Sequence, residues 1–213
     1  MILYYGSDSS FDKPEFNFGN TSNDYGQGFY LTPDWSMAKL WAGKFEDGGF
    51  VVTFDVNLDK LNICSLNDSG EQAILRWISL LSQHRFSFVE KEKYKQELEW
   101  LSRKYPFDTG QYDMIVGYRA DDSYFKYSKD FVANDISIDL LGRAMRLGKL
   151  GLQYVLISEK SFTAIQEINR EIVLPSDEYE IFKRSVLGEY NILKTQDDKI
   201  HNPTLLDFMR KNP

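Results

Sequence analysis

Cysteine and histidine are scarce in this chain. Its 213 residues include one cysteine, Cys64, and two histidines, His84 and His201. A single cysteine cannot form an internal disulfide, and so few thiol and imidazole ligands argue against a Cys-based or His-rich metal site. Cys64 lies in the apolar run L-N-I-C-S-L, which favours a small buried hydrophobe over a nucleophile.

Long apolar runs and an excess of positive charge are also missing. No apolar run approaches the ~18 residues of a membrane span, and no basic segment followed by an apolar stretch opens the chain. We therefore expect a cytoplasmic protein without a membrane anchor. The net charge of −7 provides no overall field that attracts nucleic acid. Arg143, Arg146 and Lys149 form a local basic edge that allows such contact, although a solvated helix face explains them as well.

The glycine motifs of the common nucleotide-binding folds are absent too. No G-x-G-x-x-G joins a strand to a helix, and no G-x-x-x-x-G-K-[ST] is present. Neither a Rossmann site nor a P-loop is therefore expected. The two histidines have no matching nucleophile motif, which argues against a Ser-His-Asp hydrolase.

What the chain does contain fits a globular α+β protein. Composition is 42% hydrophobic and 27% charged, and the length suits one domain. β-Branched and aromatic runs predict strands, and 3.6-residue periodicity predicts helices between them. Strands are expected at 2–5, 29–32, 50–56, 61–66, 112–117, 152–157 and 170–174. Helices are expected at 35–43, 71–81, 90–103, 122–130, 136–147 (capped by Asp135), 159–168 and from 176.

The irregular order of these elements predicts a mixed, mostly antiparallel sheet instead of a regular βαβ series. The helices at about 68–105 read as an inserted helical layer. We expect one domain over 1–175 and a C-terminal helical extension, 176–213, packed on it. The polar, turn-rich segment 8–23 is expected to cross the mouth of a cleft.

The first 41 residues carry the most specific pattern. Gly6-Ser7 stops the run I-L-Y-Y, and Gly26-Gln27-Gly28 precedes F-Y-L-T. Glycines at these points allow positive φ or a close approach to a ligand, which predicts the floor of a cleft. An ordinary core edge explains the same pattern.

Three further features stay open from the residues alone. Asp121-Asp122 follow a predicted strand, either facing a cleft or capping the next helix. Arg119 can hold a phosphate or pair with these acids. Gln153 is polar in an otherwise apolar strand, so it is either an edge position or a site residue.

Four blocks of the sequence resemble a bacterial family of unknown function, DUF3990. The blocks are L-Y-Y-G-S, D-Y-G-Q-G-F-Y-L-T with W-S-M-A-K-L-W-A, Y-D-M-I-V-G-Y-R-A-D-D, and L-Q-Y-V-L-I-S-E-K-S-F. Together they cover roughly residues 1–168. That family is similar to the ADP-ribosyltransferases of the diphtheria-toxin and poly-ADP-ribose polymerase type. The resemblance implies a split, curved β-sheet core that binds NAD without a Rossmann motif.

The resemblance also implies roles for individual residues. The Gly6 backbone is expected to bind the nicotinamide amide, with Tyr5-Gly6-Ser7 standing where His-Gly is usual. Tyr5 departs from that pattern. Tyr30 is expected to pack on the nicotinamide ring, framed by Gly28 and Thr32. Gln153 occupies the position of a Glu that binds the nicotinamide ribose.

A glutamine there can orient a ribose hydroxyl but brings no negative charge to the cation that develops in the reaction. Either the activity is then weak or another acid compensates, and the sequence offers Asp113, Asp121, Asp122 and Glu159 as such acids. The expected catalytic residues are Tyr30 and Gln153. The expected NAD-binding residues are Tyr5, Gly6, Ser7, Gly28, Tyr30, Thr32 and Gln153.

Three readings of function follow. The first is an NAD-dependent ADP-ribosyltransferase, a toxin or modifier that acts on a protein or nucleic-acid target and is paired with a cognate antitoxin. The second is a catalytically silent NAD-binding or interaction module on the same fold. The third is an unrelated interaction protein with an aromatic core. Burial of both Tyr30 and Gln153 in the interior, away from any cleft, would favour this third hypothesis.

Overall fold

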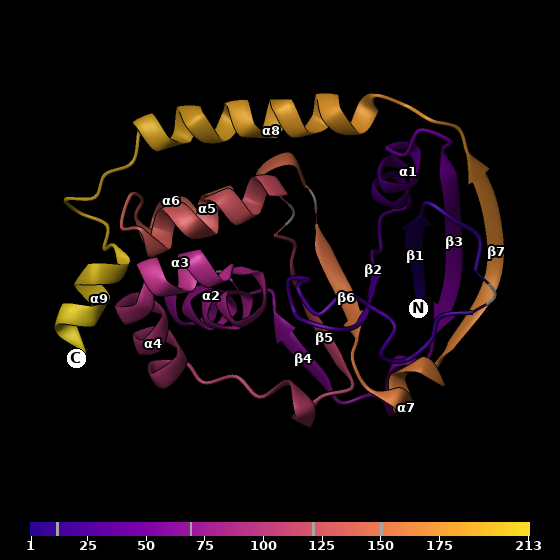
Figure 1. Ribbon diagram of the computed structural model, residues 1–213, viewed down its shortest axis with the longest axis horizontal. Coiled ribbons are helices and arrows are strands. Elements are labelled where there is room, and N and C mark those ends of the chain that lie inside the picture. The colour runs from indigo at the N-terminus through magenta and orange to yellow at the C-terminus, as the bar shows by residue number, and fades with distance from the viewer. Residues whose placement is uncertain (12, 69, 121, 150) are drawn as a thin grey trace.

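The strands of the protein form two sheets. The computed structural model describes residues 1–213 apart from 12, 69, 121 and 150, and apart from the side chains of 122–124 and 149. Sheet A has the order β1 (Ile2–Ser7), β3 (Gly49–Val56), β7 (Ile165–Val173). Sheet B has the order β2 (Phe29–Leu31), β6 (Leu152–Leu156), β5 (Met114–Tyr118), β4 (Ile63–Leu66). Figure 1 shows sheet A at one end of the molecule and sheet B beside it.

Neighbouring strands in both sheets are antiparallel, except for the parallel pair β4–β5. Parallel neighbours need a long crossover connection. Here the crossover consists of α2 (Glu71–Arg85), α3 (Phe88–Lys93) and α4 (Lys95–Lys104). The α+β class, the mixed sheet and helices within the predicted range 68–105 are thereby confirmed.

Among the described residues, one backbone-paired bridge joins the two sheets. Tyr4 of β1 donates its N–H to Thr32 O at 2.7 Å and accepts from Thr32 N at 2.9 Å. In an antiparallel ladder the next hydrogen-bonded pair would be Gly6 with Tyr30. The bridge is isolated among the described residues, so β1 and β2 diverge beyond it. The sheet is therefore split where Gly6 faces the β2 side.

Helix α1 (Trp35–Gly43) covers one face of sheet A. Asp34 caps its N-terminus by accepting from Ser36 N at 2.8 Å, two residues after the bridging Thr32. A Cβ atom on Gly6 would lie 2.2 Å from Ala38 O. The glycine thus lets the helix backbone approach the strand, which fixes the wall of the split.

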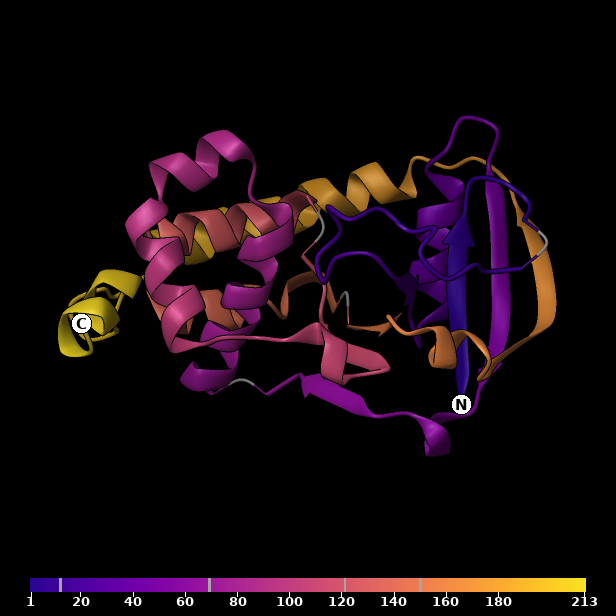
Figure 2. The ribbon, with the colours of Figure 1, turned by 60° about the horizontal axis from the view of Figure 1, so that its bottom comes forward.

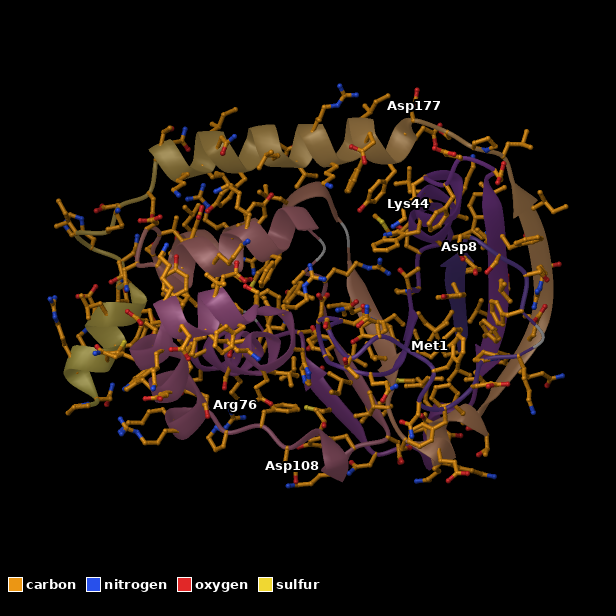
Figure 3. The ribbon with its side chains drawn as sticks, in the orientation of Figure 1. Met1, Asp8, Lys44, Arg76, Asp108 and Asp177 are labelled. Atoms are coloured by element: carbon orange, nitrogen blue, oxygen red, sulfur yellow. The ribbon has the colours of Figure 1, made fainter. Side chains whose placement is uncertain are left out.

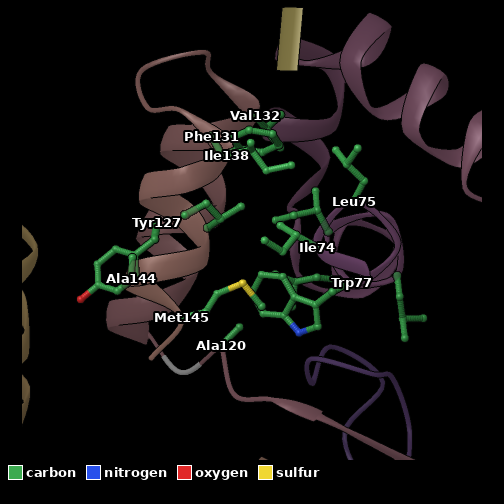
Figure 4. Packing of buried hydrophobic residues seen from close by; sticks show 14 of the residues in the cluster. Ile74, Leu75, Trp77, Ala120, Tyr127, Phe131, Val132, Ile138, Ala144 and Met145 are labelled. Atoms are coloured by element: carbon green, nitrogen blue, oxygen red, sulfur yellow. The ribbon is translucent and has the colours of Figure 1, made fainter. Parts of the chain in front are cut away.

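A layer of helices fills the other end of the molecule. To the crossover helices it adds α5 (Asp122–Val132), α6 (Ile138–Ala144), α8 (Glu178–Thr195) and α9 (Leu205–Lys211). Figure 4 shows Trp77 of α2 packing towards Met145 and Ala120 in this core. In Figure 1, α8 runs along one side from α1 to the helical layer. Val186 and Leu205 belong to the same buried cluster as Trp77, so residues after 175 share its core.

Four predictions about the limits of helices and strands are wrong for local reasons. The helix predicted over 90–103 is interrupted at Tyr94, whose φ and ψ are −109° and 30°. The cap predicted at Asp135 belongs to Ser137, which accepts from Leu140 N at 3.1 Å. The predicted helix 159–168 ends after one turn, α7 (Glu159–Phe162), and the final strand begins at Ile165 instead of Arg170.

Short 3-10 helices lie between these elements at Leu58–Lys60, Thr109–Gln111 and Leu147–Lys149. None of the helices in the described part of the chain is both long and apolar enough to cross a membrane.

The shared core predicts that the C-terminal helix stabilises the whole protein. Leu205 and Leu206 are neighbours in α9, but Leu205 is 0% exposed and Leu206 is 36% exposed. Leu205→Ala is expected to lower the free energy of unfolding by about 2–5 kcal/mol, because it leaves a cavity, and Leu206→Ala by far less. Urea unfolding followed by circular dichroism measures both. Equal effects of the two substitutions would contradict a shared core.

Candidate functional site

A cavity of about 670 Å³ lies at the split between the sheets. Its volume falls within the ~300–1,000 Å³ typical of small-molecule and cofactor sites. All seven residues expected to bind NAD line this cleft: Tyr5, Gly6, Ser7, Gly28, Tyr30, Thr32 and Gln153. They come from β1, β2, β6 and the segments beside them, so the fold brings together positions up to 148 residues apart (Tyr5 to Gln153).

Gly6 turns its backbone towards the cleft. Backbone groups alternate along a strand, and Tyr4 directs its N–H and C=O to Thr32 of β2. Gly6 is two residues further on, so its N–H and C=O point to the same side, beyond the last pair of the bridge. An adjacent donor and acceptor in this position match the hydrogen-bonding pattern of a primary carboxamide.

Tyr30 and Gln153 share one face of sheet B. Tyr30 pairs with Val155, and side chains of paired residues and of alternate residues lie on the same face, which includes Gln153. The Tyr30 hydroxyl donates to Gly26 O at 2.7 Å and accepts from Tyr25 N at 2.9 Å. Burial, and next the charge of Asp24, raise its pKa. The hydroxyl thus anchors the loop before β2, and the side chain lines the cleft.

Gln153 is held beneath the cleft by hydrogen bonds to two neighbours. It is 3% exposed, and its Nε2 donates to Asp24 Oδ2 at 2.9 Å and to Tyr118 O at 3.4 Å. Gly117 lies opposite it on β5, and a Cβ atom there would lie 2.4 Å from the Tyr25 hydroxyl. The missing side chain therefore makes room for Tyr25, which donates to Tyr118 O at 2.6 Å. Gln153 therefore lines the cleft and is not a solvent-facing edge position.

Asp24 is a cleft residue that the sequence analysis did not single out. The residue is 7% exposed and lines the cleft, and its carboxylate also accepts from Ala120 N at 2.8 Å. Arg85 Nε lies 3.6 Å from Oδ1. Asp24 opens the block D-Y-G-Q-G-F-Y, so the signal was present in the sequence. Nothing local indicated that this loop residue would meet Gln153, 129 positions away.

The Tyr5 side chain lies in an aromatic group, on the face of β1 opposite to the one that α1 covers. Its ring centroid is 4.6 Å from that of Phe29 and 5.6 Å from that of Phe11. Burial, and then the charge of Asp8, raise its pKa, so the hydroxyl stays protonated and able to donate. Ser7 donates its hydroxyl to Ser9 O at 2.8 Å, which shapes the start of the next loop.

The segment predicted to cross the cleft mouth does line the cavity. Phe11, Lys13, Phe18 and Asn23 are among its contributions, and Phe18 is 84% exposed. Figure 2 shows this indigo segment extending from sheet A across to the helices. Arg170 of β7 donates to Ser10 Oγ at 2.9 Å near one end. Near the other end, Gly26 lies against the His84 ring of α2.

Basic side chains gather along the cleft although the chain is acidic. Among the described lining residues, Lys13, Lys44, Arg85 and Arg119 are positive and Asp8, Glu15 and Asp24 are negative, a balance of +1 in a chain of −7. Figure 3 labels Asp8 just beyond β1 and Lys44 just beyond α1. The Arg119 guanidinium lies 5.5 Å from the Trp41 ring centroid. The cleft can therefore favour an anionic ligand.

The acids named from the sequence lie elsewhere or are not described. Asp113 accepts from Asn62 N and Lys160 Nζ, each at 2.8 Å, and from Ser158 Oγ at 2.7 Å, away from the cleft lining. Glu159 is exposed at the start of α7. Asp121 and the side chain of Asp122 lie outside the described residues. Asp24 is the acid beside Gln153.

The contacts of Asp113 predict a pH-dependent contribution to stability. The Asn62 N–H, then Lys160 and Ser158, lower the pKa of Asp113 from 3.8 to about 2. A lowered folded-state pKa stabilises the protein above pH ~4, and this stabilisation is lost as the pH falls towards 2. Asp113→Asn should therefore be less stable than wild type at pH 6, with a difference that shrinks by pH 2.5. Urea unfolding at both pH values measures this, and a constant difference would contradict it.

The chain matches a known protein family. A family model described as a protein of unknown function, DUF3990, matches residues 1–166. No curated protein and no solved structure matches the chain. The matched range contains every residue that lines the cleft.

Proposed function

This chain belongs to the DUF3990 family, and from its cleft we propose that it is an NAD-dependent ADP-ribosyltransferase with an ADP-ribosyltransferase-like split sheet. One observation carries the proposal. The residues expected to bind NAD converge on one cavity, at the point where β1 and β2 separate after a single bridge.

The nicotinamide end of NAD fits the split. The Gly6 N–H and C=O present a donor and an acceptor to the carboxamide, and Tyr30 offers an aromatic ring on the opposite strand. Aromatic rings stack favourably on flat heterocycles. Gln153 lies on the same face as Tyr30 and offers an amide to the nicotinamide ribose.

The basic residues of the cleft suit the pyrophosphate of NAD. Lys13, Lys44 and Arg119 line it together, and guanidinium and ammonium groups are the usual partners of phosphate oxygens. No glycine-rich cradle is needed in this arrangement, which agrees with the absence of such a motif.

The reaction breaks the bond between C1′ of the ribose and N1 of nicotinamide. The bonding electron pair leaves with nicotinamide, which becomes neutral, and the positive charge passes to C1′ and the ring oxygen. A nucleophile of the acceptor then adds its electron pair to C1′ and releases its proton. Gln153 would orient the ribose hydroxyl, and Tyr30 would hold the leaving ring. The acceptor is a macromolecule in the cytoplasm, either a protein or a nucleic acid. If the protein is a toxin of this kind, a cognate antitoxin would inhibit it.

Two observations favour a second candidate, a catalytically silent NAD-binding or interaction module. Gln153 supplies an amide where a carboxylate would stabilise the cation, and the Tyr5 ring packs against Phe11 and Phe29 where a histidine is usual. Both candidates require NAD in the cleft, so turnover separates them. The third hypothesis, an unrelated interaction protein with an aromatic core, is disfavoured because Tyr30 and Gln153 both line the cleft.

Binding of NAD and release of nicotinamide, measured on the same purified protein, test the proposal. Tyr30→Ala should weaken NAD binding about 10-fold through loss of ring stacking. Gln153→Ala should lower the rate of nicotinamide release about 10²-fold, as removal of one preorganised polar contact does in other enzymes. Gln166→Ala replaces an exposed strand glutamine outside the cleft and serves as the matched control.

Binding without release would select the silent module. Neither binding nor release in wild type would refute both candidates. Equal losses in Gln153→Ala and Gln166→Ala would show that the cleft position has no special role.

A further inference from the structure

The carboxylate of Asp24 and the amide of Gln153 form a buried pair beneath the cleft. Gln153 Nε2 donates to Asp24 Oδ2 at 2.9 Å, and both residues line the cavity. Asp24 lies on the loop before β2, and Gln153 lies on β6. Two buried polar side chains from such distant segments are costly to bring together unless their hydrogen bonds are satisfied.

The pair fixes the orientation of the Gln153 amide. An ionised carboxylate only accepts hydrogen bonds, so the amide must turn its NH₂ group towards Asp24. The Tyr118 carbonyl, 3.4 Å from the same Nε2, requires the same orientation. Oε1 is then the Gln153 atom that can accept a hydrogen bond from a ligand hydroxyl.

A backbone donor and an arginine lie beside the Asp24 carboxylate. Ala120 N donates to Oδ2 at 2.8 Å, and Arg85 Nε lies 3.6 Å from Oδ1. A fixed charge in a buried setting acts more strongly on a nearby cation than it would in water.

We propose that Asp24 is the positioning residue that supplies, through Gln153, the negative charge missing at the nicotinamide ribose. This inference rests on the function proposed above. Asp24 orients Oε1 of Gln153 towards the ribose hydroxyl, and its charge stabilises the positive C1′ as nicotinamide leaves. The negative charge and the group that orients the ribose hydroxyl are thereby divided between two residues. Gln153 is thus compatible with turnover.

A charge swap tests this division of roles. Asp24→Asn removes the charge and keeps the size of the side chain, whereas Asp24→Asn with Gln153→Glu restores one carboxylate and one amide in reversed positions. We expect Asp24→Asn to lower kcat for nicotinamide release about 10²-fold while the Kd for NAD changes less than about threefold. The double variant should regain at least 10-fold of that loss. Glu159→Gln, an exposed carboxamide substitution outside the cleft, is the matched control.

A purely structural role for Asp24 gives a different result. Asp24 would then only anchor its loop, Asp24→Asn would lower the melting temperature and weaken NAD binding, and the double variant would not recover kcat. That outcome overturns the inference, as does an Asp24→Asn variant as active as Glu159→Gln. In both cases wild-type turnover leaves the proposed function standing. Wild type that releases no nicotinamide removes the proposed function and this inference with it.

Discussion

The two backbone hydrogen bonds between Tyr4 and Thr32 are the contact on which the rest of the cleft depends. They join sheets A and B at one residue pair, and the strands separate on one side of it. Thr32 also leads directly into the cap of α1, and Gly6 admits that helix against β1. The bridge, the helix and the split therefore form one unit, in which backbone groups of Gly6 face a cavity instead of a neighbouring strand.

The loop before β2 completes this unit from the other side. Its Asp24, Tyr25 and Gly26 contact Gln153, Tyr118 and Tyr30 respectively, so the loop is tied to both β5 and β6. Gly117 provides the space in which the Tyr25 ring fits. Polar groups that would otherwise be buried without partners satisfy one another here, which favours a single arrangement of the cleft floor.

Much of this arrangement follows from the sequence, because short-range patterns determine it. Aromatic and β-branched runs predicted the strands around Tyr5, Tyr30 and Gln153. The family resemblance predicted that these three residues line one cleft. The predicted limits of helices were wrong where a single local contact determines where the helix begins or ends. Tyr94 interrupts a helix although the apolar periodicity of the sequence continues through it. Ser137 caps the helix for which the sequence predicted Asp135 as the cap. Asp24 was missed because its role depends on a contact 129 residues away, which no local pattern encodes.

A structure determined with NAD bound is the most direct test of the central claim, that the split beyond Tyr4 and Thr32 receives nicotinamide. We predict that the carboxamide is hydrogen-bonded to Gly6 N–H and C=O, that the ring lies against Tyr30, and that the ribose hydroxyl lies within reach of Gln153. NAD bound elsewhere, or bound in the cleft with its adenine in the split, would contradict it.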